Sequence, residues 1–240
     1  MQKITTNTLK QLRAALHHQA NEADAKSLQK FFKTGPGDYA EGDVFIGVRV
    51  PIIRRMAKQH QALPLRDAVT LLKSCIHEER MLALVILMHQ YKKSTPAEQT
   101  KIYNLYMTHT AHINNWDLID VTAPHIVGAY LLDKSRTPLY TLAHSQSLWE
   151  RRIAIISTLH FIKHNDYADT LAIAEILLHD THNLIHKAVG WMLREVGNRD
   201  LPTEETFLKQ RYHTMPRTML RYAIEKFPEP KRQRYLNGTA

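Results

Sequence analysis

Apolar residues recur at spacings of three and four along almost the whole chain, and this periodicity constrains the fold more than any other feature. Segments such as MLALVILM and RRIAIISTL are flanked by polar residues, and glycine is scarce, with 8 in 240 residues. A period near 3.6 is that of an amphipathic α-helix, whereas half-buried strands alternate every second residue. The sequence therefore predicts an all-α protein.

Proline residues mark the predicted helix starts. Pro51 follows Gly47-Val48-Arg49-Val50 and suits the first position of a helix, where its missing N–H removes no intrahelical hydrogen bond. That helix would carry Arg54, Arg55 and Lys58. Other prolines at predicted helix starts are Pro64, Pro96, Pro138, Pro202 and Pro216.

The N-terminal region is expected to contain two helices and a loop. Thr6 or Asn7 can cap a first helix that runs through Ala20, and a second helix is expected near Asp24 to Lys33. The segment GPGDYAEGD follows, and its glycines and proline exclude a regular helix. We therefore expect an irregular loop before Pro51.

The predicted helices fall into pairs with irregular spacing of about 30 to 40 residues, close to the period of HEAT and armadillo helix pairs. We therefore expect a HEAT/ARM-like α-solenoid, a curved superhelix whose concave face suits an extended ligand. No linker separates two parts, so residues 1–240 are expected to form a single domain. An irregular helical bundle is the alternative.

The charge balance favours a polyanionic partner. Thirty-two Lys and Arg against 23 Asp and Glu give a formal net charge of +9, and neutralising phosphates releases counterions. Apolar runs are well short of the roughly 20 residues of a membrane-spanning helix, and the N-terminus lacks a secretion signal, so we expect a cytoplasmic protein without membrane contacts. No P-loop, GxGxxG after a strand or GxSxG motif occurs.

Metal and cysteine chemistry have little support. The only cysteine, Cys75, cannot form an internal disulfide, and we expect it to be a buried structural residue. His182 and His186 stand four residues apart and could share a metal, but no third ligand is apparent and HExxH is absent. We therefore expect no metal and no cofactor.

The segment HINNWDLIDVTAPHIV carries the most suggestive pair of residues. Trp116 and Asp120 lie four apart, so on one helix they would share a face. An aromatic ring face attracts positive charge, and a carboxylate can stabilise a developing cation or orient a water. The alternatives are a packed tryptophan and a solvated aspartate. Asp117, beside Trp116, could cap the start of the helix.

Basic residues accompany two further motifs. In SLWERRIAIISTL the apolar residues take the core face, which leaves Arg151 and Arg152 near a groove, where a guanidinium can hold two phosphate oxygens. Salt bridges to Glu150 or another acid are the alternative. In HNLIHKAVGWMLREVG, Trp191 stands among Lys187 and Arg194.

The C-terminal region repeats this combination of basic and aromatic residues. Arg217 and Arg221 lie four apart near Tyr222, just after Pro216 opens a helix. Such an arrangement can bind phosphate, and a solvated basic face is the alternative. Upstream, Gly190 precedes Trp191 and indicates close approach of another helix.

Taken in order, FFKTGPGDYAEGDVFIGVRVP, NNWDLID, LWERRIAI and HKAVGWMLREVG resemble the AlkD-type DNA alkylation repair glycosylases over most of the chain. The resemblance implies a HEAT-like solenoid whose concave, basic face holds double-stranded DNA containing alkylated bases. It also implies a catalytic cluster of Trp116, Trp191 and Asp120 against the damaged nucleotide. The phosphate-contacting arginine of the WxxR pattern falls on Arg152, with Arg151 the weaker candidate.

The activity implied by the resemblance is hydrolysis of the N-glycosidic bond of N3- and N7-alkylated purines in base excision repair, without extrusion of the lesion into a deep pocket. We expect a monomer. Phe31 and Arg49 stand nearest to positions where some relatives carry a tyrosine and an uncharged polar residue. The complete set of expected DNA contacts is Arg152, Arg151, Lys187, Arg194, Arg49, Arg54, Arg217 and Arg221.

Two other functions would use the same fold. A noncatalytic HEAT-repeat scaffold would bind DNA through the same basic face without needing Asp120. A protein-binding solenoid would instead present a groove selective for apolar or acidic peptides. Salt-dependent duplex binding distinguishes the two DNA-binding functions from the protein-binding solenoid. Base release distinguishes the glycosylase from the scaffold.

Overall fold

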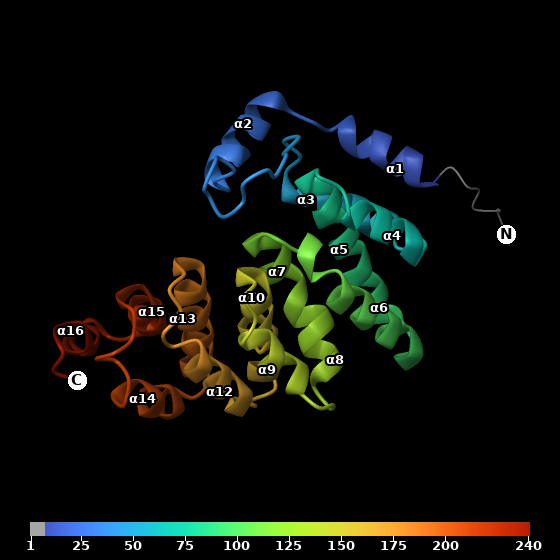
Figure 1. Cartoon of the computed structure of the whole chain (residues 1–240). Coiled ribbons are helices and arrows are strands. Elements are labelled where there is room, and N and C mark those ends of the chain that lie inside the picture. Colours follow the sequence, from blue (N-terminus) through green and yellow to red (C-terminus); the bar gives the residue numbers. More distant parts are fainter. Residues whose placement is uncertain (1–7) are drawn as a thin grey trace. The chain divides into compact units, whose positions relative to one another are not determined.

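A computed structural model describes residues 8–240, and its regular elements are all helices within that range (Figure 1). An isolated bridge between Val44 and Ile76 is the strand-like pairing found there. The predicted all-α class is therefore confirmed. Contacts divide the chain into two compact units, Met1–Thr122 and Ala123–Ala240, and the expectation of a single domain stays a prediction.

The first unit consists of helices joined by short turns and one long loop. They are α1 (Thr8–His17), α2 (Glu22–Phe31), α3 (Val50–Gln59), α4 (Leu65–Leu72), α5 (His77–Lys93), α6 (Pro96–Thr108), the short η1 (Thr110–His112) and α7 (Trp116–Ala123), whose last residue belongs to the second unit.

Helix α5 is the core of the first unit. It packs against α3, α4 and α6, and every residue from Met81 to Leu87 is buried. A helix that is apolar on all sides is stable in water only when neighbours cover it completely, and residues 81–87 meet that condition here. Its first turn is polar yet also buried, from His77 through Arg80. Those four side chains must therefore find partners inside the protein.

The loop between α2 and α3 is fixed by a buried carboxylate. Glu78 at the start of α5 accepts hydrogen bonds from the backbone N–H groups of Ile46, Gly47 and Val48, the closest at 2.8 Å. Gly47 has φ of +83°, and a Cβ there would overlap the backbone carbonyl of Asn21. Glycine is therefore required where the loop returns to α2.

The predicted helix starts agree with the structure. Pro51 lies in the first turn of α3, and Thr95 forms a capping box with Glu98 before Pro96 at the start of α6. The predicted bounds of the first two helices are wrong by a few residues, because α1 ends at His17 and α2 covers Glu22–Phe31. The proposed caps Thr6 and Asn7 lie outside the described residues.

The second unit is also a set of packed helices. They are η2 (Pro124–Gly128), α8 (Ala129–Leu131), α9 (Thr137–Ala143), α10 (Leu148–Ser157), α11 (Leu159–Ile162), α12 (Ala168–Ile176), α13 (Asn183–Gly197), α14 (Leu201–Lys209), α15 (Arg217–Ala223), η3 (Ile224–Lys226) and α16 (Glu229–Asn237).

Helix α13 is the centre of the second unit and contacts α10, α12, α14 and α15 (Figure 1). The close approach expected at Gly190 is confirmed, because a Cβ on this residue would overlap the Met219 carbonyl oxygen and Cβ of Tyr222 on α15. In the described part of the chain, no helix has the length and apolar character needed to cross a membrane.

Candidate functional site

Trp116 and Asp120 lie on one helix, as predicted. Trp116 is the first residue of α7, and both side chains are half-buried. Four residues of α-helix bring side chains to the same face, about one turn apart. The indole and the carboxylate can therefore approach the same bound group.

The indole of Trp116 is held from two directions. Its Nε1 donates a hydrogen bond of 3.3 Å to the hydroxyl of Tyr39, in the GPGDYAEGD loop. One ring face stacks on Phe32, with centroids 5.1 Å apart and planes 23° from parallel. Phe31 meets Trp116 edge-on at 6.0 Å and is 63% exposed. The loop and the end of α2 thus converge on this indole.

The stack continues into the core. Phe32 stacks on Phe45 at 4.9 Å, and Phe45 stacks on the imidazole of His77 at 4.3 Å. Phe32 also contacts the imidazole of His77 directly, with centroids 5.3 Å apart and planes tilted by 36°, so these three rings form one cluster beneath the indole. The orientation of Trp116 is therefore coupled by packing to His77.

A buried ionic network surrounds His77. Its Nδ1 lies 3.1 Å from Oδ2 of Asp43, and its Nε2 lies 2.8 Å from Oδ2 of Asp117. Arg80 donates to the other oxygen of Asp43 at 2.5 Å. Burial alone would lower the pKa of His77, but the adjacent Asp117 and Asp43 carboxylates outweigh it and raise the pKa to about 9. His77 is therefore an imidazolium at neutral pH.

The Asp43 carboxylate is stabilised by the same partners. Burial acts to raise its pKa, but the hydrogen bond from His77 and the positive charges of Arg80 and His77 lower the pKa overall. Asn115 adds a hydrogen bond from Nδ2 at 3.2 Å. A buried charge is tolerated when it is paired and hydrogen-bonded, and Asp43 satisfies both conditions.

The prediction that Asp117 caps the helix start is wrong. Asn115 lies just before α7, and its Oδ1 accepts the N–H of Trp116 at 2.8 Å. Asp117 is the second residue of the helix, where one carboxylate oxygen accepts from the next backbone N–H, that of Leu118, and the other pairs with His77. Its negative charge inside the first turn also suits the helix dipole.

Two predicted DNA contacts of the first unit lie on or beside α3. Arg49 is the residue before the helix, and its exposed guanidinium forms an ion pair with Asp24 of α2. Arg54 lies within α3, is exposed and has no ion pair to any residue that the structure describes. Arg54 is therefore the more available of the two for a phosphate.

In the second unit, Arg151 and Arg152 have different surroundings. Arg151 forms an ion pair with Asp180 at 2.6 Å and also donates to two backbone carbonyls, so the salt-bridge alternative holds for this residue. Arg152 is only 5% exposed, and its Nη1 donates to the carbonyl of Leu184 at 2.5 Å. The guanidinium of Arg152 thus joins α10 to the start of α13.

The Trp191 region lies on α13. The indole is half-buried and donates from Nε1 to Oε1 of Glu195 at 3.1 Å. Arg194 forms an ion pair with Glu225, and Lys187 is half-buried on the same helix. The positive charge of Arg194, predicted to contact DNA near Trp191, is therefore neutralised by Glu225 of the same unit.

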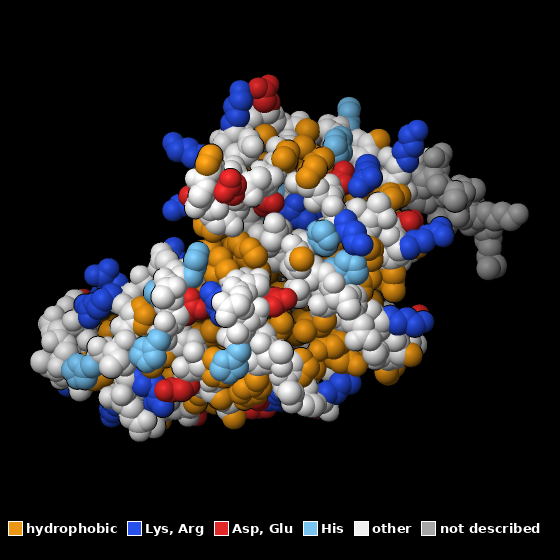
Figure 2. All heavy atoms as spheres, viewed as in Figure 1, with side chains coloured by type: hydrophobic (Ala, Val, Ile, Leu, Met, Phe, Trp, Pro, Cys, Tyr) orange, Lys and Arg blue, Asp and Glu red, His pale blue; other side chains and the backbone are white. Residues whose placement is uncertain are grey.

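Arg217 and Arg221 lie on α15, are exposed and make no ion pairs within residues 8–240. On the face drawn in Figure 2, Lys and Arg side chains are scattered among apolar and His side chains. Exposed, unpaired cations of this kind suit phosphate contacts that act additively.

Cysteine and histidine side chains outside the Trp116 region have the following surroundings. Cys75 is exposed, so the expectation of a buried structural thiol is wrong. His182 precedes α13, and its Nδ1 accepts the Leu184 N–H. His186 bonds through Nε2 to the Asp180 carbonyl at 2.5 Å. Both histidines thus have local structural roles at the start of α13.

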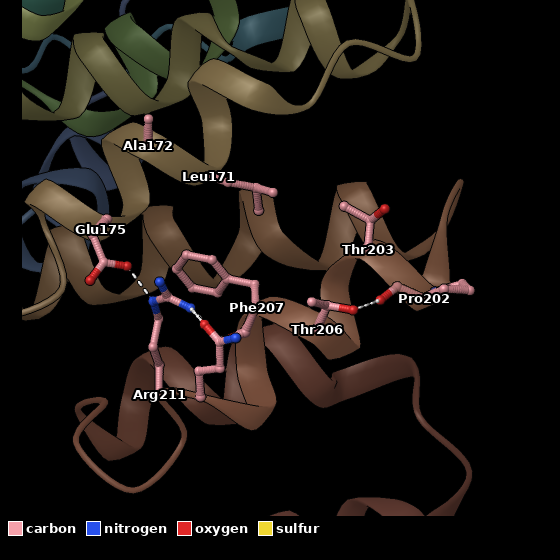
Figure 3. A pocket seen from close by; sticks show the side chains of 9 residues that line it. Leu171, Ala172, Glu175, Pro202, Thr203, Thr206, Phe207 and Arg211 are labelled. Carbon is pink, nitrogen blue, oxygen red and sulfur yellow. Dashed lines mark hydrogen bonds and ion pairs between the residues drawn. The ribbon is translucent and has the colours of Figure 1, made fainter.

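A pocket between α12 and α14 contains none of the predicted site residues (Figure 3). Its main charged group, Arg211, lies 4.3 Å over the ring of Phe207 and forms an ion pair with Glu175. That guanidinium is already neutralised and packed, so the pocket offers no free charge for an anionic ligand.

The helices and their packing define an all-helical protein of the HEAT-like class, as predicted. The family model for the DNA alkylation repair enzyme matches residues 12–227. The chain therefore belongs to the DNA alkylation repair enzyme family. No curated protein matches the sequence.

Solved structures with the same fold carry related descriptions. A predicted DNA alkylation repair enzyme from Enterococcus faecalis has a TM-score of 0.67 and 16% identity, covering 88% of this chain and 98% of its own. AlkD2 from Streptococcus mutans has a TM-score of 0.57 and 16% identity, covering 91% and 98%. The smu.31 protein of Streptococcus mutans UA159 has a TM-score of 0.51 and 17% identity, covering 91% of this chain and 98% of its own.

Proposed function

We propose that this chain is a monofunctional DNA glycosylase that removes N3- and N7-alkylated purines from duplex DNA. The observation that carries the proposal is the pairing on α7 of the Asp120 carboxylate with the Trp116 indole, which Tyr39 and Phe32 hold in place. Membership of an alkylation repair family supports a substrate of damaged DNA.

The chemistry suits these two side chains. Alkylation at N3 or N7 makes the purine cationic, so it leaves as a neutral base when the C1′–N bond breaks toward it. Positive charge then develops on the sugar, and water adds at C1′ with release of a proton. Asp120 stabilises that charge and orients the water, while the face of Trp116 favours the cationic nucleotide.

The family resemblance also implies roles for two residues of the second unit. It implies a second aromatic face from Trp191 and a phosphate contact from Arg152. Exposed cations such as Arg54 and Arg221 add salt-sensitive affinity for the DNA backbone. Neutral lesions should be poor substrates, because their bases leave with a negative charge that this site does not stabilise.

The test is single-turnover release of 7-methylguanine from a duplex oligonucleotide, with the abasic product scored by alkaline cleavage. Asp120→Asn should slow release by roughly 100-fold or more while DNA binding is retained. Asp133→Asn, which changes an exposed aspartate outside α7, is the matched control and should keep the wild-type rate.

A noncatalytic DNA-binding scaffold is the competing function. If the wild-type protein releases neither 7-methylguanine nor 3-methyladenine, yet binds duplex tightly and with strong salt dependence, the glycosylase proposal fails for these lesions. The scaffold function would then account for the basic surface.

A further inference from the structure

We propose that His77 and Asp117 are positioning residues, which fix the first turn of α7 and thereby set the orientation of Trp116 and Asp120. This inference rests on the proposed glycosylase function for its catalytic consequence. The structural part, that His77 and Asp117 fix the first turn of α7, is independent of that function and concerns described residues of the first unit alone.

The geometry requires a charged, doubly donating imidazole. Both ring nitrogens of His77 face carboxylate oxygens, Oδ2 of Asp43 at 3.1 Å and Oδ2 of Asp117 at 2.8 Å. A carboxylate can only accept, and a neutral imidazole can donate from only one nitrogen. The two contacts are therefore satisfied together only when His77 carries both protons, and its raised pKa agrees with that state.

The network is anchored on one side and attached to α7 on the other. Asp43 is held by Arg80 and by Asn115, and its side chain is 5% exposed. Asp117 is the second residue of α7, so its bond to His77 fixes the start of that helix against α5. Bonds to charged, buried groups are short and directional, and they define the position of the attached element closely.

The same imidazole also supports Trp116 through packing. Trp116 stacks on Phe32 at a centroid distance of 5.1 Å, and Phe32 contacts the His77 imidazole both directly at 5.3 Å and through Phe45 at 4.9 and 4.3 Å. Loss of the ion pair would therefore release the helix start and disturb the stack behind the indole. Asp120, one turn further along α7, would move with the helix.

Asp117→Asn is the main test variant, because it keeps the shape of the side chain and removes its charge. Glu79→Gln is the matched control. Glu79 lies two residues after His77 on α5, is similarly buried, and forms ion pairs with Arg13 and His17 of α1 rather than with α7. Each variant neutralises a carboxylate that is paired through α5, and only Asp117→Asn touches the candidate site.

The first readout is spectroscopic and needs no catalysis. In a full-length background with Trp149→Phe and Trp191→Phe, Trp116 is the remaining tryptophan. At neutral pH, Asp117→Asn should change the emission maximum of Trp116 and increase its quenching by acrylamide, whereas Glu79→Gln should change neither. An unchanged Trp116 signal in folded Asp117→Asn would overturn the proposal.

The second readout is single-turnover base release, measured in the otherwise wild-type chain. Asp117→Asn should lower the rate roughly 10- to 100-fold with duplex affinity retained, since small displacements of catalytic groups cost rates of this order. Glu79→Gln should stay within about twofold at conditions where each protein is folded. An unchanged rate in Asp117→Asn would also overturn the proposal.

Failures of the two proposals are distinguishable. If wild type releases no base while the Trp116 signal responds to Asp117→Asn but not to Glu79→Gln, the proposed function is wrong and the positioning of α7 stands. If Asp117→Asn does not fold, Asp117→Glu retains the charge and displaces the carboxylate by one methylene. It should then give the same spectroscopic and kinetic changes in smaller degree, and the absence of both would overturn the inference.

Discussion

The carboxyl group of Glu204 fills the space beside Gly197 that the Cβ of any larger residue would occupy. Glu204 is 1% exposed, and its Oε1 has no hydrogen-bond partner among the described residues. Burial, reinforced by the nearby charge of Glu205, raises the pKa of Glu204 to about 8. This contact between α13 and α14 therefore contains a protonated carboxyl group at neutral pH.

The Glu204 carboxyl should make folding stability fall as the pH rises. The group binds a proton in the folded state up to a pKa of about 8, but in the unfolded chain only up to its ordinary pKa of 4.5. The free energy of unfolding should thus decrease by up to about 1.4 kcal/mol per pH unit between these values. Glu204→Gln should remove this slope, as measured by urea unfolding from pH 5 to 8.

Glu22→Gln is the control for that series, because Glu22 is exposed and its ion pair among the described residues is with Lys26 of the same helix. Its stability should follow the wild-type curve across the same pH range. Parallel curves for wild type and Glu204→Gln would mean that Glu204 does not retain its proton in the folded protein.

Gly190→Ala should destabilise the second unit by about 1–3 kcal/mol. The added Cβ would overlap the backbone carbonyl of Met219, which cannot move without shifting α15. Gly35→Ala is the control, since its Cβ would lie 3.2 Å from the flexible end of the Asp38 side chain. Thermal unfolding of both variants gives the comparison, and equal melting temperatures would show that α15 moves away at little cost.

The sequence predicted many of the helices because their start signals and apolar faces depend on residues close together in the chain. Pro51 lies in the first turn of α3 as expected, and Trp116 and Asp120 share α7 because four residues of helix always bring side chains together. Even Gly190 could be interpreted, since a glycine inside a helix with large neighbours indicates close packing.

The buried network around His77 could not be predicted in the same way. A run of four polar residues, HEER, before an apolar helix normally indicates an exposed first turn, yet these side chains are buried. Their partners, such as Asp43 and Asp117, come from segments distant in sequence. Pairing of this kind depends on tertiary contacts, so local pattern alone assigned Asp117 to a cap and left His77 unnoticed.

The same limit applies to the arginines, where sequence alone does not separate structural from available guanidinium groups. Arg152 is buried and bonded to the Leu184 carbonyl, whereas Arg221 is exposed and makes no ion pair to a described residue. We expect Arg221→Ala to lower the salt slope of duplex binding by about one, with no change in stability. Arg152→Ala should weaken duplex binding and also reduce stability by about 1–3 kcal/mol, because a buried carbonyl loses its donor.

Duplex affinity measured between roughly 50 and 200 mM salt, together with urea unfolding of each variant, separates these effects. Lys26→Ala removes an exposed cation that pairs with Glu22 and was not predicted to contact DNA, so its salt slope should equal that of wild type. An unchanged slope for Arg221→Ala would mean that Arg221 makes no phosphate contact. Reduced stability with unchanged binding in Arg152→Ala would mean that this arginine only joins α10 to α13, and that the phosphate contact implied by the family pattern is made elsewhere.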